Sequence, residues 1–379
     1  MKCQLTAALF VFFLASACAT ADPPFATDVV AQFDEPWSMA FLPDGRLLVT
    51  EKKGELLIVT QDGENIVSVE GVPEVDYGGQ GGLGDIALHP GFADNGLVYL
   101  SYAEAGAGDT RGAAVARGVL DLSRPQPSLE DIEIIWRQYP KVSGRGHYGH
   151  RLLFDDDGYL WISSGDRQKF TPAQDMQANL GKLVRLHDDG SIPDDNPYVD
   201  YIQQDPVVDD EGVYGQLWVL GLRNPLGIAL DLKGRLWEIE MGPAGGDELN
   251  LIERGANYGY PVVSNGDHYD GREIPDHDTR SGFTRPKVWW TPVISPADLM
   301  IYRGELFGDW RGDALAAGLS SRAIVRIELG EDGSAREVER YDMGARIRSL
   351  EEGPDGAVWV LEDERRGSEG RLLKLTPRR

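Results

Sequence analysis

The chain alternates short apolar runs with turns rich in aspartate and glycine, and this unit returns six times. In each copy, a stretch of β-branched, aromatic and other apolar residues leads into a polar turn, and a second apolar stretch follows. Such alternation predicts half-buried strands, and glycine supplies the positive φ that a tight hairpin turn requires. The six predicted hairpins cover residues 39–51, 86–102, 152–166, 228–242, 299–319 (a looser copy) and 349–363.

Repetition of a hairpin that cannot bury a face alone indicates blades stacked around an axis. Helical periodicity is scarce, and no low-complexity linker interrupts the array. We therefore predict an all-β protein, a six-bladed β-propeller with four-stranded antiparallel blades, formed as one domain by residues 22–379. Each blade has about 60 residues, more than four strands need, so the excess is expected in loops. The longest are expected at 168–210 and 243–290, on a face that carries function.

The first 21 residues predict a secretory signal peptide, because Lys2 precedes a short apolar run and small residues lead up to Ala21. The apolar run is too short to span a bilayer, and no second apolar span follows. A periplasmic location is therefore expected, with lipidation at Cys18 as the open alternative. Both cysteines, Cys3 and Cys18, lie in this segment, so cleavage after Ala21 leaves no thiol for a disulfide, a nucleophile or a metal site.

The formal net charge of −25 makes nucleic acid an unsuitable partner, because such a surface repels phosphate backbones. High solubility is the simplest explanation of this negative charge. A local arginine cluster would stand out against this background as an anion site. Arg346 and Arg348 share one side of a predicted strand, Arg322 lies near the fifth hairpin, and Arg223 with Asn224 directly precedes the fourth.

Other segments offer polar groups from flexible backbone. Residues 240–261 combine glycines with Glu248 and Tyr258, and mixed backbone and carboxylate oxygens suit Ca²⁺, although a turn with solvated acids is the plainer alternative. Gln80 lies among five glycines, which allow close approach to a ligand. His147 and His150 lie three residues apart, but two histidines do not make a zinc site, which needs three or four ligands.

The order of these motifs resembles the soluble quinoprotein sugar dehydrogenases. The similarity extends from about residue 37 to 375 and is carried by GQGGLGD (79–85), HYGHR (147–151), GKLVRLHDDGSIPDDNP (181–197), RNPLG (223–227), GPAGGDELNLIERGANYGYP (242–261), RIR (346–348) and GPDGAVWVL (353–361). These proteins are six-bladed propellers that bind pyrroloquinoline quinone (PQQ) and Ca²⁺ and oxidise aldoses to lactones. The resemblance therefore implies a PQQ-dependent aldose dehydrogenase that uses an aldose and a soluble electron acceptor.

Site residues follow from the same resemblance, position by position. It makes His147 the general base and His150 a bystander that shapes the pocket. Gln80 would lie near the substrate oxygen, and Arg223 and Asn224 would contact the quinone. The cofactor carboxylates would be held by Arg322, Arg346 and Arg348. Calcium would be bound by the carbonyl groups of Gly242 and Pro243, with Glu248 and Tyr258.

Four positions depart from the family pattern, and they are expected to remove hydrogen bonds near the cofactor cleft: Leu222, Leu226, Val293 and Asp298. Two other functions remain open. A propeller hydrolase of the lactonase or phytase type would use calcium without a quinone, and a binding propeller would have lost catalysis. Arginines at several blade entrances favour an anionic cofactor over the first alternative. The sequence leaves open whether the chain is a monomer or a homodimer.

Overall fold

The computed structural model describes residues 23–200 and 212–378. The predicted signal peptide, residues 1–21, lies outside the described residues. No helix among those described is long and apolar enough to cross a membrane.

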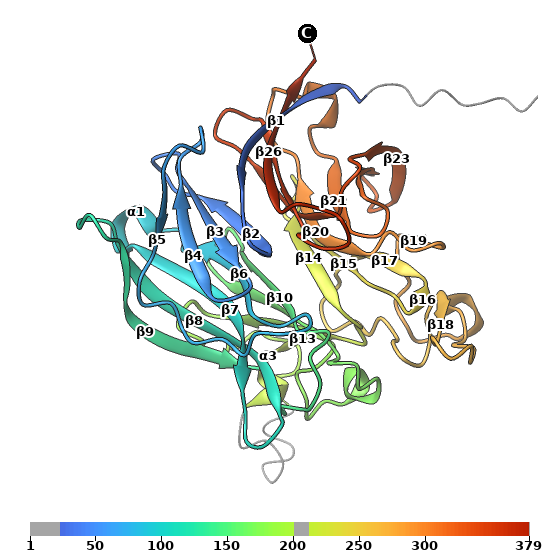
Figure 1. Ribbon diagram of the computed structural model, residues 1–379. Coiled ribbons are helices and arrows are strands. Elements are labelled where there is room, and N and C mark those ends of the chain that lie inside the picture. Colours follow the sequence, from blue (N-terminus) through green and yellow to red (C-terminus); the bar gives the residue numbers. More distant parts are fainter. Residues whose placement is uncertain (1–22, 201–211, 379) are drawn as a thin grey trace, which may run out of the picture.

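Six four-stranded antiparallel sheets form the blades of a propeller, which confirms the predicted fold (Figure 1). The first blade consists of β2 (Pro36–Phe41), β3 (Leu47–Glu51), β4 (Glu55–Val59) and β5 (Ile66–Ser68). The second consists of β6 (Leu83–Leu88), β7 (Leu97–Ala105), β8 (Arg111–Asp121) and β9 (Ser128–Arg137). The third consists of β10 (Gly149–Phe154), β11 (Leu160–Ser164), β12 (Lys182–Leu186) and β13 (Leu217–Leu220).

The remaining blades complete the ring, because the inner strand of each blade contacts the inner strand of the next. The fourth blade consists of β14 (Pro225–Leu230), β15 (Leu236–Glu240), β17 (Asp247–Leu251) and β19 (Val288–Trp290). The fifth consists of β20 (Pro296–Ile301), β21 (Ala314–Gly318), β22 (Ala323–Leu329) and β23 (Ala335–Asp342). The sixth consists of β24 (Ile347–Glu352), β25 (Val358–Glu362), β26 (Arg371–Pro377) and β1 (Phe25–Gln32).

The sixth blade joins the two ends of the described chain. Its outer strand β1 pairs antiparallel with β26, so that Phe25 lies opposite Pro377 (Figure 1). Closing the ring with the first strand of the chain removes the free sheet edge that β26 would otherwise present.

All six hairpins predicted from the sequence form the two innermost strands of a blade. In the first, Gly45 adopts a φ of +88°, and the carboxylate of Asp44 accepts the backbone N–H of Arg46 across the turn. The apolar face of one blade packs on the next, as Leu48 and Leu56 do against Leu100 of the second blade. The core is therefore a series of flat sheet-to-sheet interfaces around the axis.

The segments expected to be long loops also contain blade strands. Residues 168–210 include β12, and residues 243–290 include β17 and β19, so the predicted insertions are shorter than expected. The minor elements are α1 (Phe92–Asn95), η1 (Thr171–Gln174), α3 (Val213–Gln216), η2 (His277–Thr279), η3 (Gly308–Trp310) and a small sheet of β16 (Ala244–Gly245) and β18 (Gly266–Asp267).

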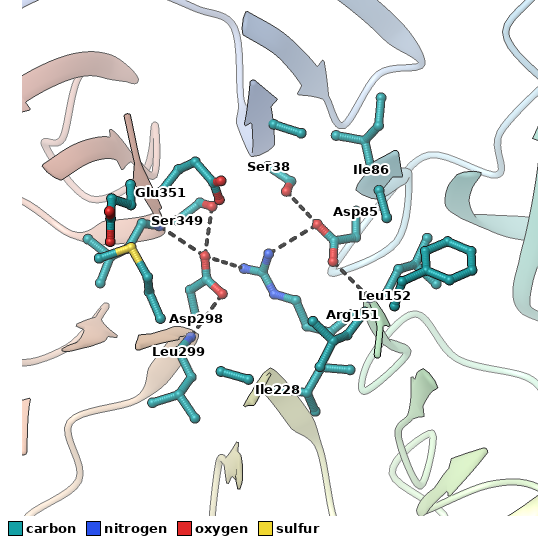
Figure 2. Close-up of a pocket in the computed structure, with 18 of the residues that line it drawn as sticks. Ser38, Asp85, Ile86, Arg151, Leu152, Ile228, Asp298, Leu299, Ser349 and Glu351 are labelled. Atoms are coloured by element: carbon teal, nitrogen blue, oxygen red, sulfur yellow. Dashed lines mark hydrogen bonds and ion pairs between the residues drawn. The ribbon is translucent and has the colours of Figure 1, made fainter. Parts of the chain in front are cut away.

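A buried guanidinium group occupies the propeller axis. Arg151, on β10, lies between two carboxylates, at 3.2 Å from Asp85 of β6 and 3.4 Å from Asp298 of β20 (Figure 2). Asp85 also accepts the hydroxyl of Ser38 on β2, and Asp298 accepts the hydroxyl of Ser349 on β24 at 2.7 Å. These five side chains, Arg151, Asp85, Asp298, Ser38 and Ser349, are called the girdle below, and they cross the centre of the ring.

Arg151 also donates to main-chain carbonyl groups of the inner strands β14, β20 and β24. Its Nε donates to the carbonyl of Leu226 on β14 at 2.7 Å, and its Nη2 donates to the carbonyls of Ala297 (2.5 Å) and Arg348 (3.3 Å). Its guanidinium carbon lies 4.3 Å from the ring centre of Trp37 on β2. One side chain on β10 therefore contacts the inner strands of the five other blades.

The girdle divides the axial channel into two ends. A funnel of about 780 Å³ lies where the inner strands end, and Asp298 and Glu351 line it (Figure 2). Asp298 accepts the backbone N–H of Leu350 at 2.9 Å as well as the Ser349 hydroxyl. The carboxylate at position 298 therefore adds hydrogen bonds at the axis, while the expected loss of hydrogen bonds near the cofactor cleft stays a prediction.

We predict that Arg151→Met lowers the free energy of unfolding by about 3–5 kcal/mol, because it leaves two buried carboxylates without a countercharge. Urea unfolding of the mature chain measures the change. Arg46→Met is the matched control, since Arg46 pairs with Asp44 at the surface and such pairs contribute at most about 1 kcal/mol. Equal losses for the two variants would contradict the central role of Arg151.

Candidate active site

A cavity of about 270 Å³ lies at the opposite end of the channel, where the inner strands begin. Its size is near the lower end for pockets that hold a small molecule. Every blade contributes to its wall. The lining residues are Trp37, Lys52, Gly79, Gln80, Tyr148, Gly149, His150, Leu226, Met241, Ser295, Leu319, Ser320, Arg346, Arg348, Arg365 and Arg366.

The charged side chains that line this cavity are all cationic. Lys52, Arg346, Arg348, Arg365 and Arg366 contribute, and none of the lining residues is acidic. Such a concentration of positive charge in a chain of net charge −25 favours an anionic ligand.

Asp363 holds the two arginines that the sequence predicted for this role. It follows β25 and accepts the Nε of Arg346 at 2.7 Å and an Nη of Arg348 at 2.9 Å. Burial alone would raise the pKa of Asp363, but the two guanidinium groups outweigh burial and hold this pKa well below its usual range. The Nε of Arg348 is buried without a hydrogen-bond partner, so it remains available to a ligand.

His147 forms a dyad with Asp166. Its Nδ1 lies 2.6 Å from the Asp166 carboxylate, and its backbone N–H donates to the side-chain oxygen of Gln80 at 2.7 Å. Since a carboxylate accepts only, Nδ1 carries the hydrogen and the neutral ring keeps a lone pair on Nε2. Burial lowers the pKa of His147 below its usual value, although Asp166 opposes this, so the ring is neutral at pH 7.

Arg223 and Asn224 lie directly before β14, next to the dyad. The backbone N–H of Asp166 donates to the carbonyl of Arg223 at 2.7 Å. The Glu240 carboxylate accepts the backbone N–H groups of both Arg223 and Asn224. The side-chain amide of Asn224 and the Nε of Arg223 are buried without partners, which indicates polar groups prepared for a ligand.

The residues that orient this site share one structural position that the sequence analysis missed. Asp166, Glu240 and Asp363 each lie at or just beyond the end of the second strand of a blade, and each holds groups that precede or begin the inner strand of the same blade. The signal was present in the sequence, because the third and sixth hairpin copies end in Asp166 and Asp363, and Glu240 lies two residues before the end of the fourth. Lys52, just after the first hairpin, and Arg365 and Arg366, just after the sixth, were missed for the same reason.

The structure does not bring every predicted residue to this cavity. Arg322 is exposed and donates at 2.9 Å to the carbonyl of Arg366, so it contacts the wall from outside. His150 lines the cavity and is 2 % exposed, and burial lowers its pKa to about 3. Leu226 is among the residues that line the cavity, whereas Leu222 packs in an apolar cluster of buried side chains.

The predicted calcium ligands surround a second, much smaller cavity of about 10 Å³, enough for one water-sized particle. Gly242, Pro243, Glu248 and Tyr258 line it. An Oε1 atom of Glu248 is buried without a partner, which fits a cation ligand.

Two of the four predicted ligands are partly engaged. The Gly242 carbonyl accepts Arg223 at 2.7 Å, and the Tyr258 hydroxyl donates to the carbonyl of Leu251 at 2.6 Å. Tyr258 can therefore offer only its main-chain oxygen. Among the described residues, no three His, Cys, Asp or Glu side chains converge as metal ligands, so any cation here depends on carbonyl groups and Glu248.

Comparison with known proteins identifies the family. The family model described as Glucose / Sorbosone dehydrogenase matches residues 33–374. The chain belongs to this family of sugar oxidoreductases, and the family and enzyme class predicted from the sequence are confirmed.

Individual relatives agree with this assignment. The aldose sugar dehydrogenase YliI of Escherichia coli is 37 % identical over 355 residues, which cover 92 % of this chain and 91 % of the relative. The crystal structure of the apo soluble aldose sugar dehydrogenase from Escherichia coli has a TM-score of 0.85 at 36 % identity, covering 93 % of this chain and 100 % of the other. The PQQ-bound aldose sugar dehydrogenase of Streptomyces coelicolor has a TM-score of 0.75 at 26 % identity, covering 94 % and 99 %.

We predict that Asp166→Asn shifts the acidic limb of the dehydrogenase pH profile to lower pH. Asp166 is the group that raises the pKa of His147 against burial, so its loss lowers this pKa further and the ring stays neutral in more acidic buffer. The same change should lower kcat about 10²- to 10⁴-fold, because the ring loses its fixed tautomer. Measuring kcat/KM against pH, with the exposed Asp189→Asn as control, tests both. An unmoved or alkaline-shifted limb would show that His147 is not the titrating base.

Proposed function

We propose that this protein oxidises aldose sugars to lactones with PQQ as the hydride acceptor. The observation that carries the proposal is the cavity whose charged lining residues are all cationic, with Gln80 in its wall bonded to His147 of the buried His147–Asp166 dyad. PQQ has three carboxylates, and a family member with 26 % identity binds it. The predicted signal segment supports a periplasmic location, with a soluble electron acceptor completing the cycle.

The cavity residues fit this cofactor. Arg346 and Arg348, held by Asp363, would bind carboxylates, and Lys52 with Arg365 adds positive charge to the same wall. When bound, PQQ supplies the quinone that accepts a hydride from C1 of the sugar.

His147 would act as the general base. Its Nε2 carries the lone pair, because Nδ1 donates to Asp166. The ring takes the proton of the anomeric hydroxyl at Nε2, and the Asp166 carboxylate stabilises the imidazolium that results. Gln80 fixes the backbone of His147 through its side-chain oxygen. Its amide group is then free to donate to a substrate oxygen.

Arg223 would supply the nearest positive charge to the reacting atoms. Its Nη1 donates to the carbonyls of Met241 and Gly242 at 2.8 and 2.7 Å, which fixes the guanidinium group between the cofactor cavity and the small cavity. Positive charge placed beforehand stabilises negative charge that develops on an oxygen during reaction.

A divalent cation, the calcium that the resemblance implies, would bind at the small cavity. Glu248 would provide a carboxylate oxygen, and Gly242, Pro243 and Tyr258 would provide carbonyl oxygens. A calcium-dependent hydrolase is less compatible with the cavity of about 270 Å³, because none of its lining residues is a carboxylate that could hold a central metal. The intact dyad argues against a binding propeller that has lost catalysis.

Reconstitution tests the function directly. Metal-free mature protein is incubated with PQQ and Ca²⁺ and then assayed with a panel of aldoses and a redox dye. We expect dye reduction that requires PQQ, protein and sugar together. Hydrolysis of lactones or phosphate esters without PQQ, and no dye reduction with any aldose, would contradict the proposal.

We predict that Arg348→Ala weakens PQQ binding about ten- to a hundred-fold, since one charged hydrogen bond contributes about 1.5–3 kcal/mol and each 1.4 kcal/mol is tenfold in Kd. Titration of PQQ into apo protein measures Kd. Arg340→Ala on the outer strand β23 is the control, because Arg340 pairs with Glu337 far along the blade. A change within twofold for Arg348→Ala would refute the anion clamp.

We predict that calcium raises the thermal midpoint of the wild type, because its ligands come together only in the folded chain. At a concentration 100 times its Kd, the expected gain is about 2.7 kcal/mol. Glu248→Gln should remove most of the gain, whereas the exposed Glu331→Gln should keep it. Equal midpoints with and without chelator, once calcium removal has been verified, would exclude the site.

A further inference from the structure

A third cavity, of about 230 Å³, lies beside β19, the outer strand of the fourth blade (Figure 1). None of the residues that line it also lines the cavity of about 270 Å³ or the small cavity. It is called the outer pocket below, and its wall includes Asn265, Asp276, His277, Asp278, Arg285 and Trp289. The outer pocket is therefore separate from the proposed cofactor and cation sites.

An exposed tryptophan forms part of the wall of the outer pocket. Side chains alternate between the two faces of a strand, so Trp289 and Trp290 of β19 point to opposite faces. Trp290 is 5 % exposed and donates from Nε1 to Glu337 at 2.7 Å, whereas Trp289 is 56 % exposed. Of the tryptophans in the described residues, Trp289 is the one that is exposed. Core packing does not explain a large flat ring at this position, and such a ring offers a stacking surface to a ligand.

Polar side chains without protein partners also line the outer pocket. Asp276 and Asp278 offer carboxylates, Arg285 offers a guanidinium group and Asn265 offers an amide. Within residues 23–200 and 212–378, the structure shows no hydrogen bond or ion pair made by any of these side chains. Arg285 is exposed and shares the pocket with two carboxylates without pairing with either. Donors and acceptors therefore remain available to a ligand.

Buried contacts fix the backbone that carries these polar groups. The backbone N–H of Asn265 donates to the Glu248 carboxylate. His277, which lies between the two aspartates in the sequence, is 3 % exposed, and its Nε2 donates to the carbonyl of Tyr258 at 2.9 Å, since a carbonyl only accepts. A site held in this way loses little conformational freedom when a ligand binds.

A neutral sugar ring has the surface that this wall complements. A pyranose presents an apolar face of C–H groups and a rim of hydroxyl groups, each of which can donate and accept. The Trp289 ring suits the apolar face, the carboxylates accept from hydroxyl groups, and Arg285 and Asn265 donate to them. Two carboxylates against one guanidinium group, in a chain of net charge −25, disfavour a uronate or a sugar phosphate. The pocket is smaller than the roughly 300–1,000 Å³ of sites for drug-sized ligands, so it suits a single ring.

We propose that the outer pocket binds one ring of a neutral glycan and is a second carbohydrate site, separate from the cavity proposed for sugar oxidation. This binding needs neither PQQ nor His147, so it goes beyond the proposed function and does not depend on it. Such a site holds a neutral glycan at the surface of the fourth blade.

Titration of apo protein with maltotriose and, separately, with trigalacturonate tests the proposal, with no PQQ present. Calorimetry measures Kd, and acrylamide quenching of tryptophan fluorescence reports the exposure of Trp289. We expect maltotriose to bind and to reduce the quenching, and trigalacturonate to bind about tenfold more weakly or not at all.

Two variants locate the bound sugar. Trp289→Ala should weaken maltotriose binding about tenfold or more, because it removes the stacking surface, and Arg285→Ala should weaken it about fivefold, because it removes a charged donor. Arg280→Ala is the matched control, since Arg280 is an exposed arginine of the same segment that does not line the pocket, and it should change Kd by less than about twofold. Thermal midpoints verify that each variant is folded.

Sugar can also enter the cavity of about 270 Å³ in apo protein, so the difference between wild type and variants carries the result. Equal Kd values for maltotriose in wild type, Trp289→Ala and Arg285→Ala would overturn the proposal. Equal quenching of wild type with and without maltotriose, or tighter binding of trigalacturonate, would also overturn it. Because PQQ is absent, each of these outcomes leaves the dye-reduction test of the proposed function unaffected.

Discussion

The guanidinium group of Arg151 is the contact on which the rest of the structure depends. It lies on the axis and bonds two carboxylates and three main-chain carbonyls, so one side chain joins the inner strands of all six blades. Buried charges of this kind are costly unless each finds its partner. The ring therefore has a fixed centre, and one end of the channel is separated from the other. The residues proposed for catalysis lie on one side of this barrier.

The active site is built on the repeat that makes the fold. In three blades, an acidic residue at the end of the second strand bonds the residues at the start of the inner strand, and in each case those residues are functional candidates. Asp166 fixes the ring of His147, Glu240 fixes the backbone of Arg223, and Asp363 fixes Arg346. Because the same position is used in the third, fourth and sixth blades, these groups lie at one end of the axis. The hairpins that build the blades therefore also position the proposed catalytic and cofactor-binding residues.

Whether a feature of the fold or of the site could be predicted depends on how far apart in the sequence the interacting residues lie. Hairpin turns such as Asp44-Gly45 are local, so the six blades and their order followed from the sequence. Arg346 and Arg348 line the cavity and His147 is bonded to the lining residue Gln80, whereas the predicted Arg322 is exposed, so a sequence position does not fix where a side chain points. The pair of Arg151 with Asp298 joins segments far apart in the chain, and no spacing reveals such a contact. The carboxylates behind the functional residues were visible as hairpin ends, yet only the fold shows what they hold.

The most direct test of the account is a crystal structure of the mature protein with PQQ bound. We predict that the quinone occupies the cavity of about 270 Å³, with carboxylates within hydrogen-bond distance of Arg346 or Arg348 and its ring system beside His147. A cofactor seated in the funnel of about 780 Å³ beyond Arg151, or held without any of the cationic cavity residues, would contradict it.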